Sequence, residues 1–341
     1  MDRTTVHTAG WDHDQELSGK RVAIIGTGAS AIQVIPEIAP IVERLTGFQR
    51  TPIWCFPKFD VPLSAAARRM MRLPVGRTLQ RLISQAYVEF TSPLAAQYFT
   101  VNPLAKRMGA LGAAYLRKQV DDPVVRDQLR PRYAVGCKRP GFHNTYLSTF
   151  NRDNVDLVTE PIDKITGSGV VTTDGVLHEV DVLILATGFK VLDIDNVPTF
   201  PVSGPGGRSL ARFWDENRLQ AYEGVSVPGF PNFFTVFGPY GYVGSSYFAL
   251  IEAQTRHIVR CLDAAHRRRA TRVEVRKEAN DRYFAEMMSK RHRQIFWQDS
   301  CQLANSYYFD QHGDVPLRPT TTFEAYWRSR RFPIDDYEFV S

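Results

Sequence analysis

The chain has 341 residues, with 42 Lys and Arg against 36 Asp and Glu and a formal net charge of +6. Apolar residues make up 43% and charged residues 23%, which is typical of a globular protein with one large or two ordinary domains. No run of ~18 uncharged apolar residues occurs, which argues against a transmembrane segment. Because the first residues lack the apolar stretch of a signal peptide, we expect a cytoplasmic protein.

Local charge and cysteine spacing narrow the classes of ligand further. Residues 60–150 carry 14 Lys and Arg against 5 Asp and Glu, an excess that suits nucleic acid, an acidic membrane surface or an anionic cofactor. No nucleic-acid module signature accompanies these charges, so we expect no nucleic-acid partner. None of the four cysteines lies in a CxxC pair or in a Cys/His cluster with ligand spacing, so we expect no metal site.

The clearest predicted element is residues 20–25, a continuous apolar run that ends at glycine and indicates a buried parallel strand. A G-x-G-x-x-A turn follows, and residues 32–38 predict a helix that Pro36 should kink or shorten. Residues 44–49 predict a second strand, which ends at Arg50 and Thr51.

A strand, this turn and a helix in succession form the dinucleotide-binding pattern of an α/β Rossmann-type domain. Gly26 permits the tight turn, Gly28 lets a pyrophosphate approach the backbone, and Ala31 allows close packing of helix and strand. The free N–H groups at the helix N-terminus then face the phosphates. The predicted cofactor-binding residues here are Gly26, Thr27, Gly28, Ala29, Ser30 and Ala31.

The end of the second predicted strand distinguishes NADP from NAD. In the NAD form an acidic residue about 20 positions beyond the turn binds the ribose 2′-hydroxyl. This chain has no acid there but has Arg50 and Thr51. Because a guanidinium can grip a 2′-phosphate through two hydrogen bonds, these residues favour NADPH.

Residues 60–135 predict a helical insertion, rich in Ala, Leu, Arg and Met. Its composition also suits a helix lying at a membrane surface, an alternative that we rank lower because Pro74 and Gly76 interrupt the apolar face. Beyond it we expect strands at 154–158 and 181–189, a hairpin at 170–180 that turns at 173–175, helices at 245–265 and 280–293, and an irregular tail from Trp297.

Several segments resemble Baeyer–Villiger monooxygenases, which belong to the wider class of flavin-containing monooxygenases. The matching segments occur in the family's order and cover nearly the whole chain from about His7: HTAGWDHDQELSGKRVAIIGTGASAIQ, FQRTP, GCKRP, FNRDNVDLVTEPI, DVLILATGF and GFPNFFTVFGP. The resemblance implies a Rossmann-type NADP-binding domain with a helical insertion, plus an incomplete remainder of the FAD domain. The implied divisions are a linker at 1–18, the NADPH domain at 19–190 with its insertion at about 60–135, and part of the FAD and substrate domain at 191–341.

The resemblance also implies roles for individual residues. Arg50, Thr51 and Lys138 would hold the 2′-phosphate of NADPH. Arg139 would match the family's catalytic arginine, whose fixed guanidinium can stabilise an anionic flavin intermediate and position the nicotinamide. Thr187 and Gly188, in the DVLILATGF segment, would contact the cofactor.

The family signature F-x-G-x-x-x-H-x-x-x-W is present here in part. His7 and Trp11 match it, whereas Met1 and Arg3 occupy the phenylalanine and first glycine positions. No second G-x-G-x-x-G in a strand–helix context appears, and we interpret residues 204–207 as a loop. We therefore expect a truncated chain without the FAD-binding module, in which FAD binding is doubtful.

The complete enzyme would use NADPH, FAD and O2 to convert a small-molecule ketone to an ester or lactone, and we expect this chain to be inactive alone. One alternative is a non-catalytic NADPH-binding remnant, or a subunit that needs a separate partner supplying the FAD module. The other is a flavin monooxygenase that oxygenates nitrogen or sulfur in a heteroatom substrate.

Overall fold

A computed structural model describes residues 4–60, 62–91, 103–189, 191–192, 198–242, 244 and 246–341. Met1 and Arg3, discussed above, and Ser245, the expected start of a helix, lie outside the described residues. The chain divides into two compact units. Unit 1 comprises Met1–Val61, Lys106–Phe189 and Gln302–Asn305, and unit 2 comprises Pro62–Ala105, Lys190–Cys301 and Ser306–Ser341.

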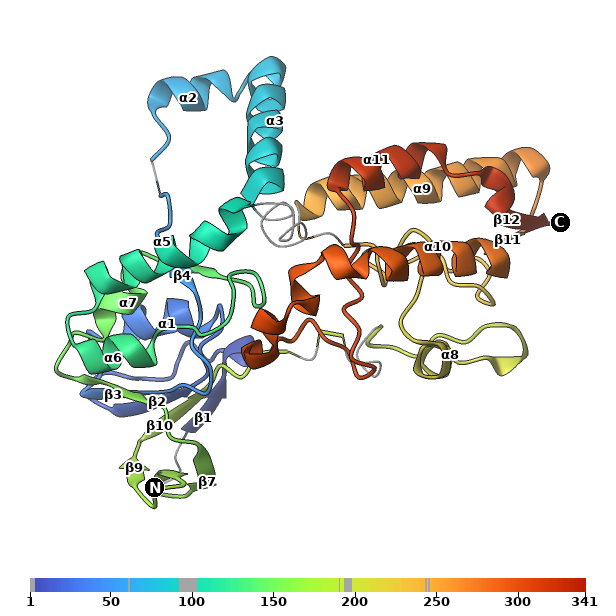
Figure 1. The fold of residues 1–341 in the computed structure, drawn as a ribbon. Helices are drawn as coiled ribbons and strands as arrows, with labels where there is room; N and C mark the ends of the chain where they lie inside the picture. The colour runs from blue at the N-terminus through green and yellow to red at the C-terminus, as the bar shows by residue number, and fades with distance from the viewer. Residues whose placement is uncertain are drawn as a thin grey trace. The chain divides into compact units, whose positions relative to one another are not determined.

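Unit 1 is built on a five-stranded parallel sheet with the order β1-β10-β2-β3-β6 (Figure 1). The α/β fold class predicted from the sequence is thereby confirmed. Continuous apolar runs form the inner strands because both faces of a parallel sheet are covered. The strands are β1 (Thr4–His7), β2 (Arg21–Ile25), β3 (Arg44–Phe48), β6 (Val155–Val158) and β10 (Val182–Leu185).

The core of unit 1 lies between this sheet and α1 (Ala31–Ile38). Ile32, Ile35 and Ile38 form the buried face of the helix and pack with the fully buried Ile24 of β2. The helix has only eight residues and contains Pro36, in agreement with the prediction of a shortened helix. The other helices of this region are α5 (Pro103–Gln119), α6 (Pro123–Gln128) and α7 (Tyr146–Thr149).

The segment expected to be a linker, residues 1–18, instead contributes a strand to the sheet. Thr4–His7 pairs in parallel with β10, from Thr4 opposite Val182 to His7 opposite Leu185. The sequence of this strand, TTVH, has one buried apolar residue, Val6. A four-residue strand with so little apolar character is defined by its pairing partner, which lies far away in the sequence.

Two smaller sheets complete the strands of unit 1. β7 (Ile162–Thr166), β8 (Gly169–Thr172) and β9 (Leu177–Glu179) form an antiparallel sheet, which includes the predicted hairpin at 170–180. Thr172 and Asp174 hydrogen-bond across its turn through their side chains at 2.6 Å. β4 (Cys55–Phe56) pairs in parallel with β5 (Gly141–Phe142), a pairing that matters for the site described below.

Unit 2 contains most of the long helices, among which α9 and α11 pack side by side (Figure 1). The predicted helices at 245–265 and 280–293 are confirmed as α9 (Tyr247–Arg268) and α10 (Lys277–Lys290). Residues 204–207, interpreted as a loop, contain one short 3₁₀ turn, Pro205–Gly207. The remaining elements are α2 (Ala65–Met70), α3 (Pro74–Thr91), α8 (Leu210–Asn217), α11 (Thr322–Arg331), β11 (Arg272–Val275) and β12 (Tyr337–Val340).

The expectation of an irregular tail from Trp297 was wrong. Thr321 caps α11 by accepting a hydrogen bond from the Glu324 N–H at 3.0 Å, as in a capping box. β12 pairs antiparallel with β11, which lies about 60 residues earlier in the chain. In the part of the chain that the structure describes, no helix is long and apolar enough to cross a membrane.

Candidate dinucleotide site

The turn after β2 is formed by a close approach of three strand ends. Gly26 has φ of 122°, and a Cβ atom there would lie 2.3 Å from the Ala186 carbonyl oxygen beyond the end of β10. Its N–H donates to the Phe48 carbonyl of β3 at 3.2 Å. Glycine is therefore required at position 26 by both backbone conformation and space.

Gly28, by contrast, borders open space. It is exposed, and a Cβ atom built on it would meet no heavy atom within 4 Å. Among the described residues, no backbone hydrogen bond uses the N–H groups of Gly28, Ala29 or Ser30, and the Ser30 side chain makes no capping hydrogen bond. Free N–H groups at the positive end of a helix create a site for an anion, and the room over Gly28 would admit a phosphate.

Thr27 ties this turn to the end of the second strand. Its Oγ1 donates to the Thr51 carbonyl oxygen at 2.7 Å. Thr51 is buried, whereas the neighbouring Arg50 is exposed. The structure thus brings the predicted 2′-phosphate residues Arg50 and Thr51 next to the G-x-G-x-x-A turn, although they follow it by about 20 positions.

A second connection brings in the loop that carries Lys138 and Arg139. The Gly141 N–H donates to the Trp54 carbonyl at 2.7 Å, where β5 pairs with β4. Trp54 Nε1 donates to the Tyr133 carbonyl at 2.8 Å, and Tyr133 Oη donates to the Pro52 carbonyl at 2.7 Å. The loop is therefore anchored on both sides to the segment that follows Arg50 and Thr51.

The charged side chains beside the dinucleotide turn suit an anionic ligand. Burial lowers the pKa of Lys138 from its ordinary value of 10.5, and the positive charge of nearby Arg50 lowers it further. In the described part of the chain, none of the salt bridges includes Arg50, Lys138 or Arg139. Two neighbouring cations without a carboxylate partner favour an anionic ligand such as a phosphate.

The remaining predicted residues lie at the edges of this site. Thr187 and Gly188 are exposed and follow β10, directly after the Ala186 carbonyl that meets Gly26. Gly188 has φ of 88°, a conformation that favours glycine. Arg139 is exposed beside the half-buried Lys138, and no described hydrogen bond joins it to the turn.

Asn305 is a site residue that the sequence did not indicate. Its Nδ2 donates to Thr51 Oγ1 at 3.3 Å, and its backbone is left-handed with φ of 47°. It lies 254 positions from Thr51. Because Asn tolerates the left-handed conformation, the residue type fits this position, but no local pattern predicts the contact.

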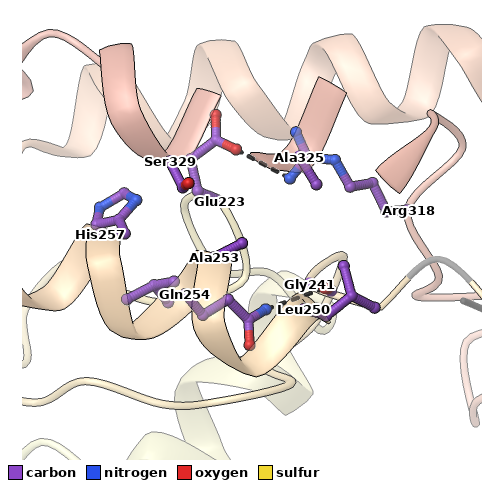
Figure 2. A pocket seen from close by; sticks show the side chains of 10 residues that line it. Glu223, Gly241, Leu250, Ala253, Gln254, His257, Arg318, Ala325 and Ser329 are labelled. Atoms are coloured by element: carbon purple, nitrogen blue, oxygen red, sulfur yellow. Dashed lines mark hydrogen bonds and ion pairs between the residues drawn. The ribbon is translucent and has the colours of Figure 1, made fainter. Parts of the chain in front are cut away.

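Unit 2 contains a separate small cavity between α9 and α11 (Figure 2). Glu223, 5% exposed, joins two arginines there: Arg318 Nη1 lies 3.0 Å and Arg328 Nε 2.7 Å from its carboxylate oxygens. His257 also lines this cavity, and burial, aided by the charges of Arg260 and Arg318, lowers its pKa to about 3. Paired charges and a neutral histidine indicate a structural cluster in this cavity.

Comparison with known proteins identifies relatives of the chain. No family profile matches the chain. Baeyer–Villiger monooxygenases of Streptomyces coelicolor and Pseudomonas aeruginosa are each 36% identical to it over 98% of its length. The chain is thus similar in sequence to Baeyer–Villiger monooxygenases over nearly its whole length. A FAD-binding monooxygenase of Aspergillus niger, ktnD, is 35% identical over 81% of the chain.

Two solved structures agree with the fold. An OTEMO complex with FAD and NADP superposes with a TM-score of 0.85 at 25% identity, over 100% of this chain and 71% of that one. A steroid monooxygenase bound to NADP gives 0.81 at 28% identity, over 99% and 70%. The chain spans 63% of the length of the two Baeyer–Villiger monooxygenases it matches by sequence.

Proposed function

We propose that this chain forms the NADPH-binding and C-terminal part of a Baeyer–Villiger monooxygenase, which uses NADPH, FAD and O2 to convert a ketone to an ester or lactone. One observation carries the NADPH assignment. Arg50 and Lys138 lie close enough for the charge of Arg50 to lower the pKa of Lys138, the described salt bridges give neither an acidic partner, and the dinucleotide turn beside them is open at Gly28. The proposal for the whole reaction is supported by relatives named for that activity.

Each predicted residue has a task in binding NADPH. The pyrophosphate would lie over Gly28 and accept hydrogen bonds from the free N–H groups of Ala29 and Ser30. Arg50, Thr51 and Lys138 would hold the 2′-phosphate, which an NADH molecule lacks. Thr187 and Gly188 would border the cofactor beyond β10. When bound, NADPH supplies a hydride.

Arg139 is proposed as the catalytic residue because it matches the family's arginine in the GCKRP segment. Its guanidinium is exposed, and the loop that carries it is anchored at Gly141 to the Trp54 carbonyl. A guanidinium remains protonated at any working pH and can stabilise negative charge on a reactant held beside it.

The described residues contain no comparable turn for the pyrophosphate of FAD. Their one G-x-G-x-x-A turn is already assigned to NADPH, and the sequence has no second such turn between a strand and a helix. We therefore propose that the FAD pyrophosphate is held by a separate FAD-binding module, with residues 191–341 completing the FAD and substrate domain and residues 19–190 forming the NADPH domain. A cytoplasmic location is part of this proposal.

Cofactor binding by the purified chain tests the proposal first. Titration with NADPH and with NADH should give much tighter binding of NADPH, and a visible spectrum after addition of FAD reports whether flavin is retained. Equal affinity for the two nucleotides would refute the assignment of Arg50 and Lys138. A FAD-binding module is then added to the chain, and oxygen uptake is followed with an electrode in the presence of a ketone or a sulfide. Formation of an ester or lactone from the ketone supports the proposal. Formation of a sulfoxide alone contradicts it and favours the class that oxygenates nitrogen or sulfur.

A further inference from the structure

The helices α2 and α3 expose an apolar row that has no partner in the described contacts. We call this row the α3 stripe; its members are Leu73 (61% exposed), Val75 (79%), Leu79 (49%), Leu82 (63%) and Ile83 (62%). Within α3 the last four occur at i, i+4, i+7 and i+8, which places them on one face of the helix. A row of large apolar side chains this exposed is characteristic of an interaction surface.

The structure removes the objection that Pro74 and Gly76 interrupt this face. Pro74 is the first residue of α3, where a missing N–H leaves no hydrogen bond unmade. Gly76 lies in the same first turn, and a Cβ atom there would clash with the Met70 carbonyl at the end of α2. The two residues therefore shape the junction between α2 and α3, and the apolar face runs uninterrupted from Val75 onward.

The charge around the α3 stripe is strongly positive. Residues 62–91 contain a single acid, Glu89, and five arginines, all exposed: Arg68, Arg69, Arg72, Arg77 and Arg81. Arg81 pairs with Glu252 of α9, and the salt bridges of the described residues include none of the other four. An apolar face combined with a basic polar face is the pattern of helices that lie in the plane of a membrane surface.

We propose that α2 and α3 form an anchor that binds an anionic lipid surface. The α3 stripe would enter the boundary between headgroups and acyl chains, and the arginines would bind lipid phosphates. Charge complementarity favours this occupant, because a protein partner would have to bring an acidic rim to match four unpaired arginines. The helix would lie on the membrane, in keeping with the lack of a spanning helix in the described residues.

Binding to lipid vesicles tests this proposal independently of NADPH. The full chain is mixed with vesicles of phosphatidylcholine alone, or of phosphatidylcholine and phosphatidylglycerol, and separated by flotation. We expect binding to the anionic vesicles that weakens with added salt, and little binding to the neutral ones. The double variant Leu79→Ser/Ile83→Ser should bind at least about tenfold more weakly, because two side chains no longer enter the lipid.

A matched control variant distinguishes binding through the α3 stripe from non-specific hydrophobic binding to vesicles. Val259 and Leu262 of α9 are 46% and 50% exposed, so Val259→Ser/Leu262→Ser removes a similar apolar area elsewhere and should leave vesicle binding unchanged. Equal loss in both double variants, or no binding to anionic vesicles, would overturn the proposal. So would self-association on size-exclusion chromatography that the stripe variant abolishes, since it would make the stripe a protein contact.

A charge variant keeps the test decisive if the serine variant fails to fold. Arg68→Gln/Arg69→Gln/Arg72→Gln leaves the apolar face intact and should lose most of the preference for anionic vesicles. Circular dichroism and NADPH affinity report on the fold of each variant. Unchanged lipid preference in a folded triple variant would contradict the proposal.

Discussion

Two pairs of cations, one pair in each unit, are used in opposite ways. In unit 2, Arg318 and Arg328 are held by Glu223, and Arg328 also pairs with Glu286 at 3.0 Å. In unit 1, Arg50 and Lys138 lie near each other, and the described salt bridges give neither a carboxylate. Because a buried charge is costly unless it is paired, the first arrangement stabilises the fold. The second arrangement leaves the charges of Arg50 and Lys138 available to bind an anionic ligand.

Differences in burial explain why the arginines of unit 2 need a carboxylate partner and the two cations of unit 1 do not. Arg318 is 2% exposed, and without Glu223 its charge would be left in a dry interior. Arg50 is exposed and Lys138 is half-buried, so water can solvate both side chains when no anion is bound. Stability and ligand affinity should therefore respond to different substitutions in the two units.

The largest effect is expected from removing the central carboxylate of unit 2. Glu223→Gln keeps the size of the side chain but leaves Arg318 and Arg328 without their shared anion, and we expect a loss of about 3–5 kcal/mol in the free energy of unfolding. Urea denaturation measures it. Glu216→Gln, which breaks the exposed pair with Arg212, should cost less than about 0.5 kcal/mol. Similar losses in the two variants would show that Glu223 is not structural.

The two glycines of the dinucleotide turn should separate stability from binding. Gly26→Ala forces a Cβ atom against the Ala186 carbonyl at a φ that alanine rarely adopts, and should destabilise the protein by about 2 kcal/mol or more. Gly28→Ala meets open space and should change stability by less than about 0.5 kcal/mol, yet fill the approach of the pyrophosphate and weaken NADPH binding. Thermal unfolding and nucleotide titration of both variants test this contrast.

Removing one unpaired cation should affect the ligand and spare the fold. Arg50→Gln is expected to weaken NADPH binding by about 10- to 100-fold, since a charge-assisted hydrogen bond to phosphate is worth about 1.5–3 kcal/mol. NADH affinity and the unfolding free energy should remain nearly constant, because the described structure gives Arg50 no acidic partner to lose. A parallel fall in NADH affinity would indicate that Arg50 supports the turn and does not read the 2′-phosphate.

Lys138 should give NADPH binding a pH dependence. Its pKa in the folded protein lies below 10.5, so between the two values the unfolded chain binds more protons and the stability of the fold rises with pH. Phosphate binding needs the protonated amine, so NADPH affinity should fall as pH rises through the lowered pKa. Lys138→Arg keeps its charge and should abolish this dependence over the same range. If the pH dependence of NADPH affinity were unchanged in that variant, Lys138 would not be a phosphate-binding residue.

The smallest effect is expected at Asn305. Its amide donates to Thr51 Oγ1, so Asn305→Asp would replace a donor with a negative charge beside the proposed 2′-phosphate site. We expect a several-fold loss of NADPH affinity, with NADH affinity unaffected. Asn305→Ala, which removes this one long, part-buried hydrogen bond without adding charge, should lower NADPH affinity by about twofold or less. Equal affinities of the Asp and Ala variants for NADPH would show that position 305 lies away from the phosphate.

The sequence by itself determined the parts of the molecule in which neighbouring residues act together. The apolar run of β2, the G-x-G-x-x-A turn and the helix α1 lie within residues 21–38, so their spacing predicts both the structure and the ligand class. Arg50 was predicted in the same way, because it lies just beyond the strand β3, which follows directly. The family resemblance, which rests on ordered local segments, extended this reasoning to Lys138 and Arg139.

Only the tertiary structure decided which distant segments meet. β1 is a strand because it pairs with β10, and Lys138 comes close to Arg50 because β5 pairs with β4. The contact of Asn305 with Thr51 and the bridge of Glu223 to Arg318 span 254 and 95 positions. Residue spacing reports the periodicity of one helix or strand, whereas such contacts depend on how separate elements pack, which is set by the shape and burial of the whole core.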